Sequence, residues 1–237
     1  MAETLSERAR ELFAPLGPTY DRYARLLSLG QDPRWRRFLV SRVPVGADDV
    51  VLDIATGTAA VALELVRQKG CSVVGIDQSP EMLEEARRRL LLAAETKRVR
   101  LVEASAAALP FADGSFDGLT AAYLLRYLDD LPAGLRELGR VLRPGATAAT
   151  LDFAVPAAPL PRAAWTLYVD LALPVLGRAI SPGWHEVGRF LGSSIRDFDA
   201  RFPLPRLLTL WREAGFEDVR ARWLGLGGCV VVWGRRK

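Results

Sequence analysis

The chain has 237 residues, half of them hydrophobic, which is enough to bury a full core in one domain or in one domain with a cap. Its net charge of +4 raises the question of nucleic-acid binding, but apart from two clusters, 34–37 and 87–89, the arginines are scattered at helical spacing. We therefore expect solvated helix faces. Attraction to anionic lipid head groups and RNA binding are the alternatives.

The N-terminus and the cysteines bear on location. Met1 to Arg10 is polar and charged where a signal peptide needs an apolar run. Cys71 and Cys229 lie in apolar segments and are expected to be buried free thiols, which fits a reducing, cytoplasmic setting. One histidine and two distant cysteines offer no metal site.

Residues 1–45 are predicted to form an N-terminal helical cap. Two short amphipathic helices, 4–13 and 19–28, are separated by prolines and a glycine. A third helix starts at Asp32–Pro33, where Asp32 has the chemistry of an N-cap and Pro33 suits the first helical position.

The next segment has the pattern of half a nucleotide-type site. An apolar strand, Val50 to Ile54, breaks into the small-residue turn 55–58 and then into a helical pattern from about Ala60 to Lys69. A second strand, Ser72 to Ile76, ends in Asp77. Such a turn lets backbone amides approach a ligand, and an acid in this place accepts two ribose hydroxyls.

Three interpretations compete for this segment. It is an ordinary strand–helix–strand unit in which Asp77 caps the next helix, a dinucleotide site, or a site for S-adenosylmethionine. A dinucleotide fingerprint needs three glycines, and this turn offers only Gly57. S-adenosylmethionine has a ribose but no pyrophosphate. The stretch Val51 to Thr58 resembles motif I of the class I methyltransferases, with Asp77 in the place of their ribose-binding acid.

That resemblance implies S-adenosyl-L-methionine as the cofactor and a set of binding residues. Met82, in a helix that Ser79 and Pro80 start, would lie against the adenine, although simple core packing explains a methionine equally well. Ser105 stands where the family commonly has an acid or amide for the adenine. The implied set is Asp53, Ala55, Thr56, Gly57, Thr58, Asp77, Gln78, Met82, Ser105, Ala106 and Ala122.

The middle of the chain continues the alternation of strands and helices. Strands are predicted over 98–102, 116–123 and 147–153, with a helix from Leu131 to Leu142 that ends at Arg143–Pro144–Gly145. The turn 109–117 closely resembles a signature of the same methyltransferases. An Asn/Asp-Pro-Pro-Tyr stretch, typical of nucleic-acid amino-methyltransferases, is replaced by Ala-Ala-Tyr-Leu at 121–124, so we expect no nucleic-acid partner.

A helical insertion is predicted at about 156–203. Its segment Ala163 to Ile180 is strongly apolar but short and interrupted for a membrane span. We expect a buried helix there; an apolar lid over a greasy substrate is the alternative. A helix from 204 to 214 and strands 219–224 and 229–233 finish the chain, and the glycine-rich connection between them predicts that the last strand is antiparallel.

The expected fold is therefore an α/β, Rossmann-like sheet of seven mostly parallel strands, with helices on both faces and an antiparallel last strand. Residues 46–237 would form the methyltransferase domain, including the insertion. Most of 13–236 resembles the C-methyltransferases of menaquinone and ubiquinone biosynthesis. The carrying segments include Tyr20–Asp21, Trp35–Arg36 and 190–195.

Three departures from that family stand out. Ala24 and Tyr127 replace asparagines, and Ala59–Ala60 replaces a Gly-Asp pair. The missing acid removes an expected contact to the methionine half of the cofactor. Affinity would then be lower, or Asp53 and backbone groups would suffice.

The resemblance implies methyl transfer to a ring carbon of a demethylmenaquinol or a ubiquinone precursor. In-line displacement needs the acceptor carbon held near the methyl group, and a base or cation near the ring hydroxyl would activate it. Candidates are Arg126, His185 and Tyr123, of which Arg126 is favoured to stabilise phenolate character.

A prenylated quinol would bring the enzyme into peripheral contact with the inner membrane face, and the insertion would be a lid or a homodimer contact. Two other functions stay open. One is a methyltransferase of another small apolar metabolite, and the other is a non-catalytic cofactor-binding protein.

Overall fold

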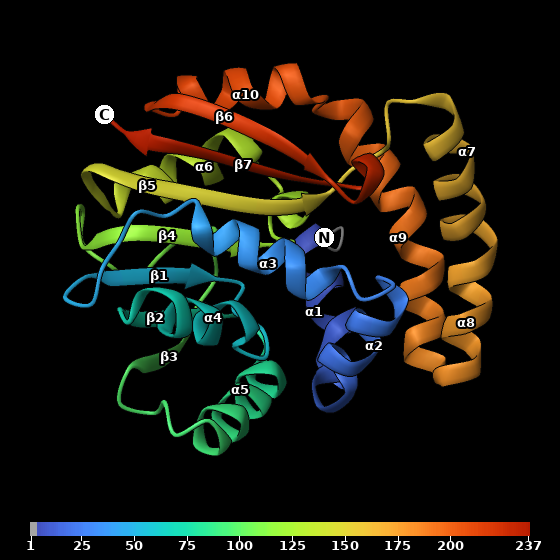
Figure 1. The fold of residues 1–237 in the computed structure, drawn as a ribbon, viewed down its shortest axis with the longest axis horizontal. Helices are drawn as coiled ribbons and strands as arrows, with labels where there is room; N and C mark the ends of the chain where they lie inside the picture. The colour runs from blue at the N-terminus through green and yellow to red at the C-terminus, as the bar shows by residue number, and fades with distance from the viewer. Residues whose placement is uncertain (1–3) are drawn as a thin grey trace.

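The structure, a computed structural model, describes residues 4–237 and is built on one sheet of seven strands (Figure 1). The strand order is β3-β2-β1-β4-β5-β7-β6. Only β7 runs against its neighbours, which confirms the predicted fold class with its reversed last strand. The strands are β1 Val50–Ile54, β2 Ser72–Asp77, β3 Val99–Glu103, β4 Phe116–Ala122, β5 Leu142–Phe153, β6 Phe216–Leu224 and β7 Cys229–Arg236.

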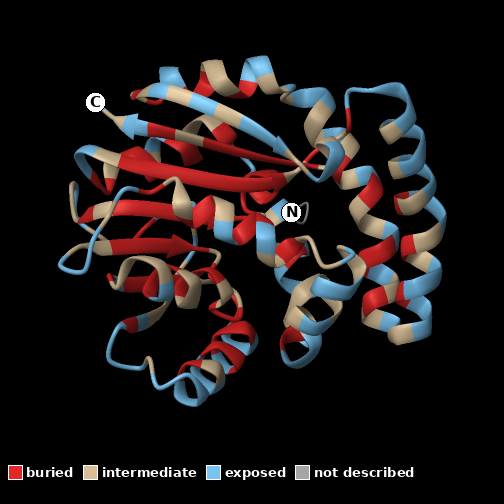
Figure 2. Cartoon of the chain, in the orientation of Figure 1, coloured by how far each residue is buried: buried red, intermediate tan, exposed pale blue. Residues whose placement is uncertain are grey.

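The central strands are apolar on both faces because helices cover both sides of the sheet. Along β1, Val51 belongs to one hydrophobic cluster, whereas Leu52 and Ile54 belong to the other. Figure 2 shows these strands as the most continuously buried part of the chain. One face is covered by α3 Asp32–Ser41, α4 Ala60–Lys69 and α5 Pro80–Leu92, and the other by α6 Leu131–Arg140 and α10 Leu204–Glu213.

The connection from α6 to β5 differs from the prediction. The helix ends at Arg140, and the Arg143–Pro144–Gly145 stretch lies in β5 rather than at a helix end. The register against β4 shifts between Phe116 and Gly118, so the first part of β5 pairs irregularly with its neighbour. A proline is tolerated there because its missing N–H interrupts no regular hydrogen bond of the sheet. The signals for a helix end were present but lay just beyond it. Cys71 and Cys229 are buried and free, as expected.

The N-terminal segment forms α1 Leu5–Phe13, a 3₁₀ turn Ala14–Thr19, α2 Tyr20–Leu27 and then α3. Residues 1–3 of the predicted cap lie outside the described residues. The expected N-cap role of Asp32 is wrong, because Gln31 is the N-cap and Asp32 is the first residue of the helix. Its carboxylate instead accepts hydrogen bonds from Arg36 and Tyr123.

The insertion forms α7 Pro159–Leu167, a π-helical turn Tyr168–Ala172, α8 Leu173–Ile180 and α9 Pro182–Arg201. Helices α8 and α9 pack closely through two glycines: a Cβ on Gly177 would collide with the Trp184 carbonyl oxygen, and one on Gly188 would lie 2.8 Å from that of Leu173. In Figure 1 these helices stand beside the sheet as a separate layer, next to α2.

The expectation of a buried helix over 163–180 is wrong. Only Val169, Leu173 and Gly177 are buried in that stretch. The expectation that it is too short for a span also fails, because Pro159–Ile180 is the one helix of the described chain that is long and apolar enough to cross a membrane. Length and composition alone do not make it a span, since its inner face lines a cavity and packs on α9.

Candidate functional site

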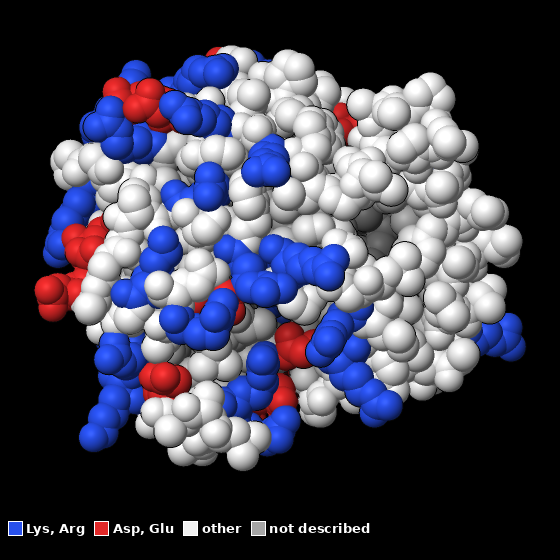
Figure 3. Space-filling model, viewed as in Figure 1, with Lys and Arg blue, Asp and Glu red and all other residues white. Residues whose placement is uncertain are grey.

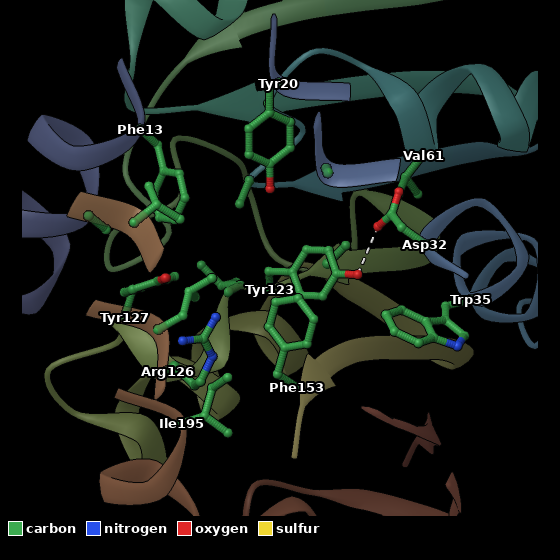
Figure 4. Close-up of a pocket in the computed structure, with 18 of the residues that line it drawn as sticks. Phe13, Tyr20, Asp32, Trp35, Val61, Tyr123, Arg126, Tyr127, Phe153 and Ile195 are labelled. Carbon is green, nitrogen blue, oxygen red and sulfur yellow. Dashed lines mark hydrogen bonds between the residues drawn. The ribbon is translucent and has the colours of Figure 1, made fainter. Parts of the chain in front are cut away.

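A cavity of about 1040 Å³ lies where the parallel strands end, between the sheet and the N-terminal and inserted helices. Binding sites of α/β sheets lie at this edge, outside the carboxyl ends of the strands. Figure 4 shows aromatic and apolar side chains around it, with Arg126, Asp32 and Tyr127 as polar members. Residues from both ends of the sequence therefore share one wall.

The turn after β1 has a tightly wound backbone. Ala55, Gly57 and Ala59 all have left-handed φ, between 54° and 63°. Small residues tolerate this conformation at lower cost than large ones. The amides of the turn are used within the protein: Thr56 donates to the Ile76 carbonyl at 2.9 Å, and Gly57 donates to Asp77 at 2.8 Å. The expectation that these amides contact a ligand is therefore corrected for both residues.

Asp77 lines the cavity at the end of β2. Its Oδ2 accepts the Gly57 amide and its Oδ1 accepts the Ser79 amide at 3.0 Å. Burial raises the pKa of this carboxyl, and the amides oppose the rise. An ionised carboxylate has about four acceptor sites, so two remain for a ligand. Two free acceptors at a fixed strand end match the two hydroxyls of a ribose.

Asp53 is placed differently from the prediction. It is 1% exposed and lies beneath the turn rather than on the cavity wall. Its two oxygens accept hydrogen bonds from Thr56 at 2.6 Å and Thr120 at 2.7 Å. Burial raises its pKa to about 6, against the effect of these two hydroxyls. Asp53 thus fixes the turn through Thr56 instead of reaching into the cavity.

The other expected cofactor residues line the cavity. Gln78 is held by Ser6 of α1, whose hydroxyl donates to its side-chain oxygen at 2.8 Å. Met82 is buried on the wall, whereas Ser105 is exposed at the rim and its hydroxyl accepts the amide of Ala107. The lining members of the set are Ala55, Thr56, Gly57, Thr58, Asp77, Gln78, Met82, Ser105, Ala106 and Ala122.

Arg126 provides the cationic group of the opposite wall. It follows β4 in a short 3₁₀ turn, Leu125–Tyr127, and is 4% exposed. Its Nη1 donates to Ser194 of α9 at 3.1 Å, and its guanidinium lies over the ring of Phe153 at 5.5 Å. The sequence places this arginine after a strand end, but only the fold brings α9 against it.

Two further polar groups close to Arg126 were missed by sequence reasoning. Asp152, near the end of β5, is 3% exposed, and its Oδ1 lies 3.7 Å from the Arg126 Nε. Within the described chain neither of these atoms has a hydrogen-bond partner, and the same is true of the Tyr127 hydroxyl. Burial raises the pKa of Asp152 to about 7, although Arg126 lowers it. The available signal was an acid between apolar residues at a strand end, as at Asp53.

The Tyr123 hydroxyl and the His185 Nδ1, two of the predicted candidates, both have partners within the protein. Tyr123 lines the cavity, but its hydroxyl donates to Asp32 at 2.8 Å and burial raises its pKa well above the ordinary value, so it stays protonated. His185 lies outside the cavity lining, on α9 against α8. Its Nδ1 is 3.0 Å from the Pro174 carbonyl, which can only accept, so that nitrogen carries a proton.

This strand order, the small-residue turn and the acid at the end of β2 define a class I S-adenosylmethionine-dependent methyltransferase. Residues 1–236 match the ubiE/COQ5 methyltransferase family, and the chain belongs to that family. It is therefore an S-adenosylmethionine-dependent enzyme.

Individual relatives agree with this assignment. The chain is 38% identical over 229 residues to the ubiquinone/menaquinone biosynthesis C-methyltransferase UbiE of Geobacter sp. strain M21, covering 96% of this chain and 95% of the relative. It is 39% identical to a demethylmenaquinone methyltransferase of Thermus thermophilus, over 95% and 100% of the two chains. A crystal structure of a methyltransferase from Thermotoga maritima shares the fold, with a TM-score of 0.63 at 20% identity over 96% and 99%.

Proposed function

We propose that this enzyme methylates a ring carbon of a prenylated hydroquinone of the demethylmenaquinol type. The observation that carries the proposal is the polar end of the cavity. Arg126 and Tyr127 stand among apolar and aromatic lining residues, and Ser194 and Asp152 hold the Arg126 guanidinium there. A small polar cluster in an apolar site fits an acceptor that is a flat ring with one or two oxygens.

The volume of the cavity supports two ligands at once. Sites for single drug-sized molecules run from about 300 to 1,000 Å³, and this cavity reaches the upper end of that range. Asp77 and Arg126 follow β2 and β4, which flank β1. A nucleoside at Asp77 therefore leaves the end of the cavity at Arg126 for an acceptor. The names of the relatives from Geobacter and Thermus agree with a quinone-type acceptor.

When bound, S-adenosylmethionine supplies a methyl group on a positively charged sulfur. Arg126 is placed to hold the oxygen of the acceptor ring and to stabilise negative charge that develops there. Asp152 lies directly behind that guanidinium, with a pKa of about 7. Asp152 lies outside the cavity lining, so we assign it the positioning of Arg126 and no proton transfer with the acceptor. The apolar walls exclude water from the reacting carbon.

The test is an acceptor screen with radiolabelled cofactor. Purified enzyme is incubated with a short-chain demethylmenaquinol, a ubiquinone precursor quinol, a sterol and RNA, and label in each product is counted. We expect label in a prenylated hydroquinone only. The matched control is the same compound kept oxidised, which lacks the hydroxyl that Arg126 would act on and should stay unlabelled. Label in the sterol, or in the oxidised quinone, contradicts the proposal.

A prenylated acceptor also implies contact with a lipid surface. Leu29 and Leu226 line the cavity and are nevertheless 78% and 86% exposed. The outer face of α7 and α8 carries a stripe of exposed apolar side chains at helical spacing: Leu160, Leu167, Leu171 and Val175. Figure 3 shows a hollow in the surface between an arginine-rich half and the almost uncharged half that α7–α9 form. We propose that this apolar rim meets an anionic bilayer.

Vesicle sedimentation tests this contact. The double variant Leu29→Ser/Leu226→Ser should lose most of its binding to vesicles of anionic lipid and keep its affinity for the cofactor. The matched control is Leu91→Ser/Leu92→Ser, which changes two leucines that are exposed to a similar degree but lie away from the cavity. Equal binding by both variants contradicts the proposal. A dimer of the wild-type protein in sedimentation velocity, broken by the first variant only, would assign the rim to a second copy.

A further inference from the structure

Two buried charges on the cavity wall have no part in the proposed reaction. Asp32 and Arg36 stand one turn apart on α3, and each side chain is 9% exposed. The Arg36 Nε donates to both carboxylate oxygens, at 3.0 and 2.9 Å. Burying such a pair is costly, and its attraction often does not repay the loss of hydration. A pair kept at the wall of a cofactor site therefore raises the question of what it binds.

Arg36 still has donors to offer. Its Nε is used by Asp32, but no described residue accepts a hydrogen bond from either Nη. Each of these two nitrogens keeps some accessible surface, and Arg36 lines the cavity. Two parallel N–H groups on a planar guanidinium bind a carboxylate in bidentate fashion.

Asp32 has acceptors to offer. Its Oδ1 accepts the Tyr123 hydroxyl at 2.8 Å as well as the Arg36 Nε, whereas its Oδ2 accepts only the latter. A carboxylate has about four acceptor sites, so one stays open. Figure 4 shows this carboxylate on the cavity wall, which Val61 in the first turn of α4 also lines. That turn begins after Ala59 and has no acid of its own.

The position of the pair selects one part of the cofactor. Asp77, the ribose acid, follows β2, whereas Tyr123, the partner of Asp32, follows β4 on the other side of β1. The positive charge of Arg36 also acts on Asp53 at the end of β1, where it partly offsets the rise in pKa that burial causes. Asp77 and the Asp32–Arg36 pair therefore lie on opposite sides of the turn after β1.

We propose that Arg36 binds the α-carboxylate and Asp32 the α-ammonium of the methionine half of the cofactor. The acid missing from the start of α4 is then replaced by one from the N-terminal helices. A cation and an anion held side by side match a zwitterion, and each ligand charge meets its opposite inside the wall. This inference concerns the cofactor only and is independent of which acceptor is methylated.

Calorimetry with two ligands tests the assignment. S-adenosylhomocysteine has the amino-acid group, whereas 5′-methylthioadenosine has the same nucleoside and thioether without it. Arg36→Gln should weaken S-adenosylhomocysteine binding by about tenfold or more, the loss of one charge-assisted contact, and leave methylthioadenosine binding within about twofold. The matched control is Arg34→Gln, which changes an exposed arginine of the same helix. Equal losses for both ligands, or no loss for either, would overturn the proposal.

Removing one member of the pair leaves the other charge buried without its partner, which destabilises the folded state. The double variant Asp32→Asn/Arg36→Gln removes both charges and should give the same ligand pattern. The wild-type protein provides a measurement that needs no variant: S-adenosylhomocysteine without its carboxylate should bind about tenfold or more weaker than the intact compound. Equal affinity of the two compounds refutes the role of Arg36 even if no variant folds.

Discussion

The two walls of the cavity differ in the contacts that hold their polar side chains. On the sheet side, the Gly57 amide donates to Asp77 and the Thr56 hydroxyl donates to Asp53, so neighbouring residues of one strand–turn–strand unit fix one another. On the helical side, Arg126 is held by Ser194 of α9 and lies beside Asp152 near the end of β5. The sheet wall thus depends on local contacts, whereas the helical wall depends on contacts between segments far apart in the sequence. We propose that the first recognises the invariant cofactor and the second the acceptor.

The strongest break of the sheet wall is Asp77→Ala. It removes both the proposed ribose acceptors and the partner of the Gly57 amide, so we expect cofactor affinity to fall by about a hundredfold or more. Isothermal calorimetry with S-adenosylhomocysteine measures it. Glu103→Ala is the control, because Glu103 pairs with Asp77 in the strand register but is exposed and absent from the cavity wall. A variant with native affinity would show that the ribose is held elsewhere.

The helical wall is probed by Arg126→Ala. We expect kcat to fall by about a hundredfold, as for removal of a group that stabilises developing oxyanion charge, with cofactor affinity within about twofold. Steady-state kinetics with the prenylated quinol and calorimetry with the cofactor separate the two effects. Arg189→Gln, an exposed arginine of α9, should leave both unchanged. Similar losses in kcat and in cofactor affinity would show that Arg126 also serves the cofactor, which contradicts the assignment of the helical wall to the acceptor.

Asp152 gives the helical wall a pH dependence of stability. Burial raises its pKa to about 7 from an ordinary value of 3.8. Between these two pH values the native state holds a proton that the unfolded chain has released, so the free energy of unfolding falls as pH rises and levels off above about 7. Asp152→Asn cannot titrate, and its Tm relative to the wild type should rise across this window.

Thermal melts from acid to mildly alkaline pH, run on both proteins, give that difference curve directly. Asp53→Asn is a useful second curve, since the pKa of Asp53 is raised to about 6 and its window should close earlier. A flat difference for Asp152→Asn would show that its carboxyl titrates normally.

The smallest effect is expected from His185→Ala. The histidine bonds the Pro174 carbonyl and lies outside the cavity lining, so kcat and KM should both stay within about twofold of the wild type. Steady-state kinetics over a pH series provides the check. If the variant lost an ionisation that the wild-type pH–rate profile shows, His185 would have to be counted among the catalytic residues.

Local pattern predicted the turn and the position of Asp77 in the sheet wall, but not that Asp53 is buried beneath the turn. A turn of small residues between two apolar strands specifies its own backbone, and the acid that ends the second strand is placed by the strand register. The helical wall depends on tertiary packing, which pattern does not contain. A lone histidine such as His185 does not say which face of its helix meets a cavity. The acid Asp152 looked like one polar residue in an apolar strand, and its partner Arg126 is 26 residues away in the sequence.

The same limit explains the two errors on helices. Apolar composition over 163–180 indicates burial of some kind, but it cannot separate contact with a core from contact with a cavity or a lipid surface. Asp32 has the chemistry of an N-cap, yet the helix begins one residue earlier and leaves its carboxylate for Arg36 and Tyr123. In both cases the sequence shows the chemistry of the side chains but not which residues they contact in the fold.

The reversed direction of β7 separates the two chain ends. Helix α1 begins beside Gln78 and Asp129, at the edge of the sheet where ligands enter (Figure 1). Because β7 is antiparallel, Lys237 leaves the sheet at the opposite edge. An affinity tag or immobilisation linker fused behind Lys237 would therefore stay clear of the working edge, whereas one placed directly ahead of α1 would be carried to the cofactor entrance.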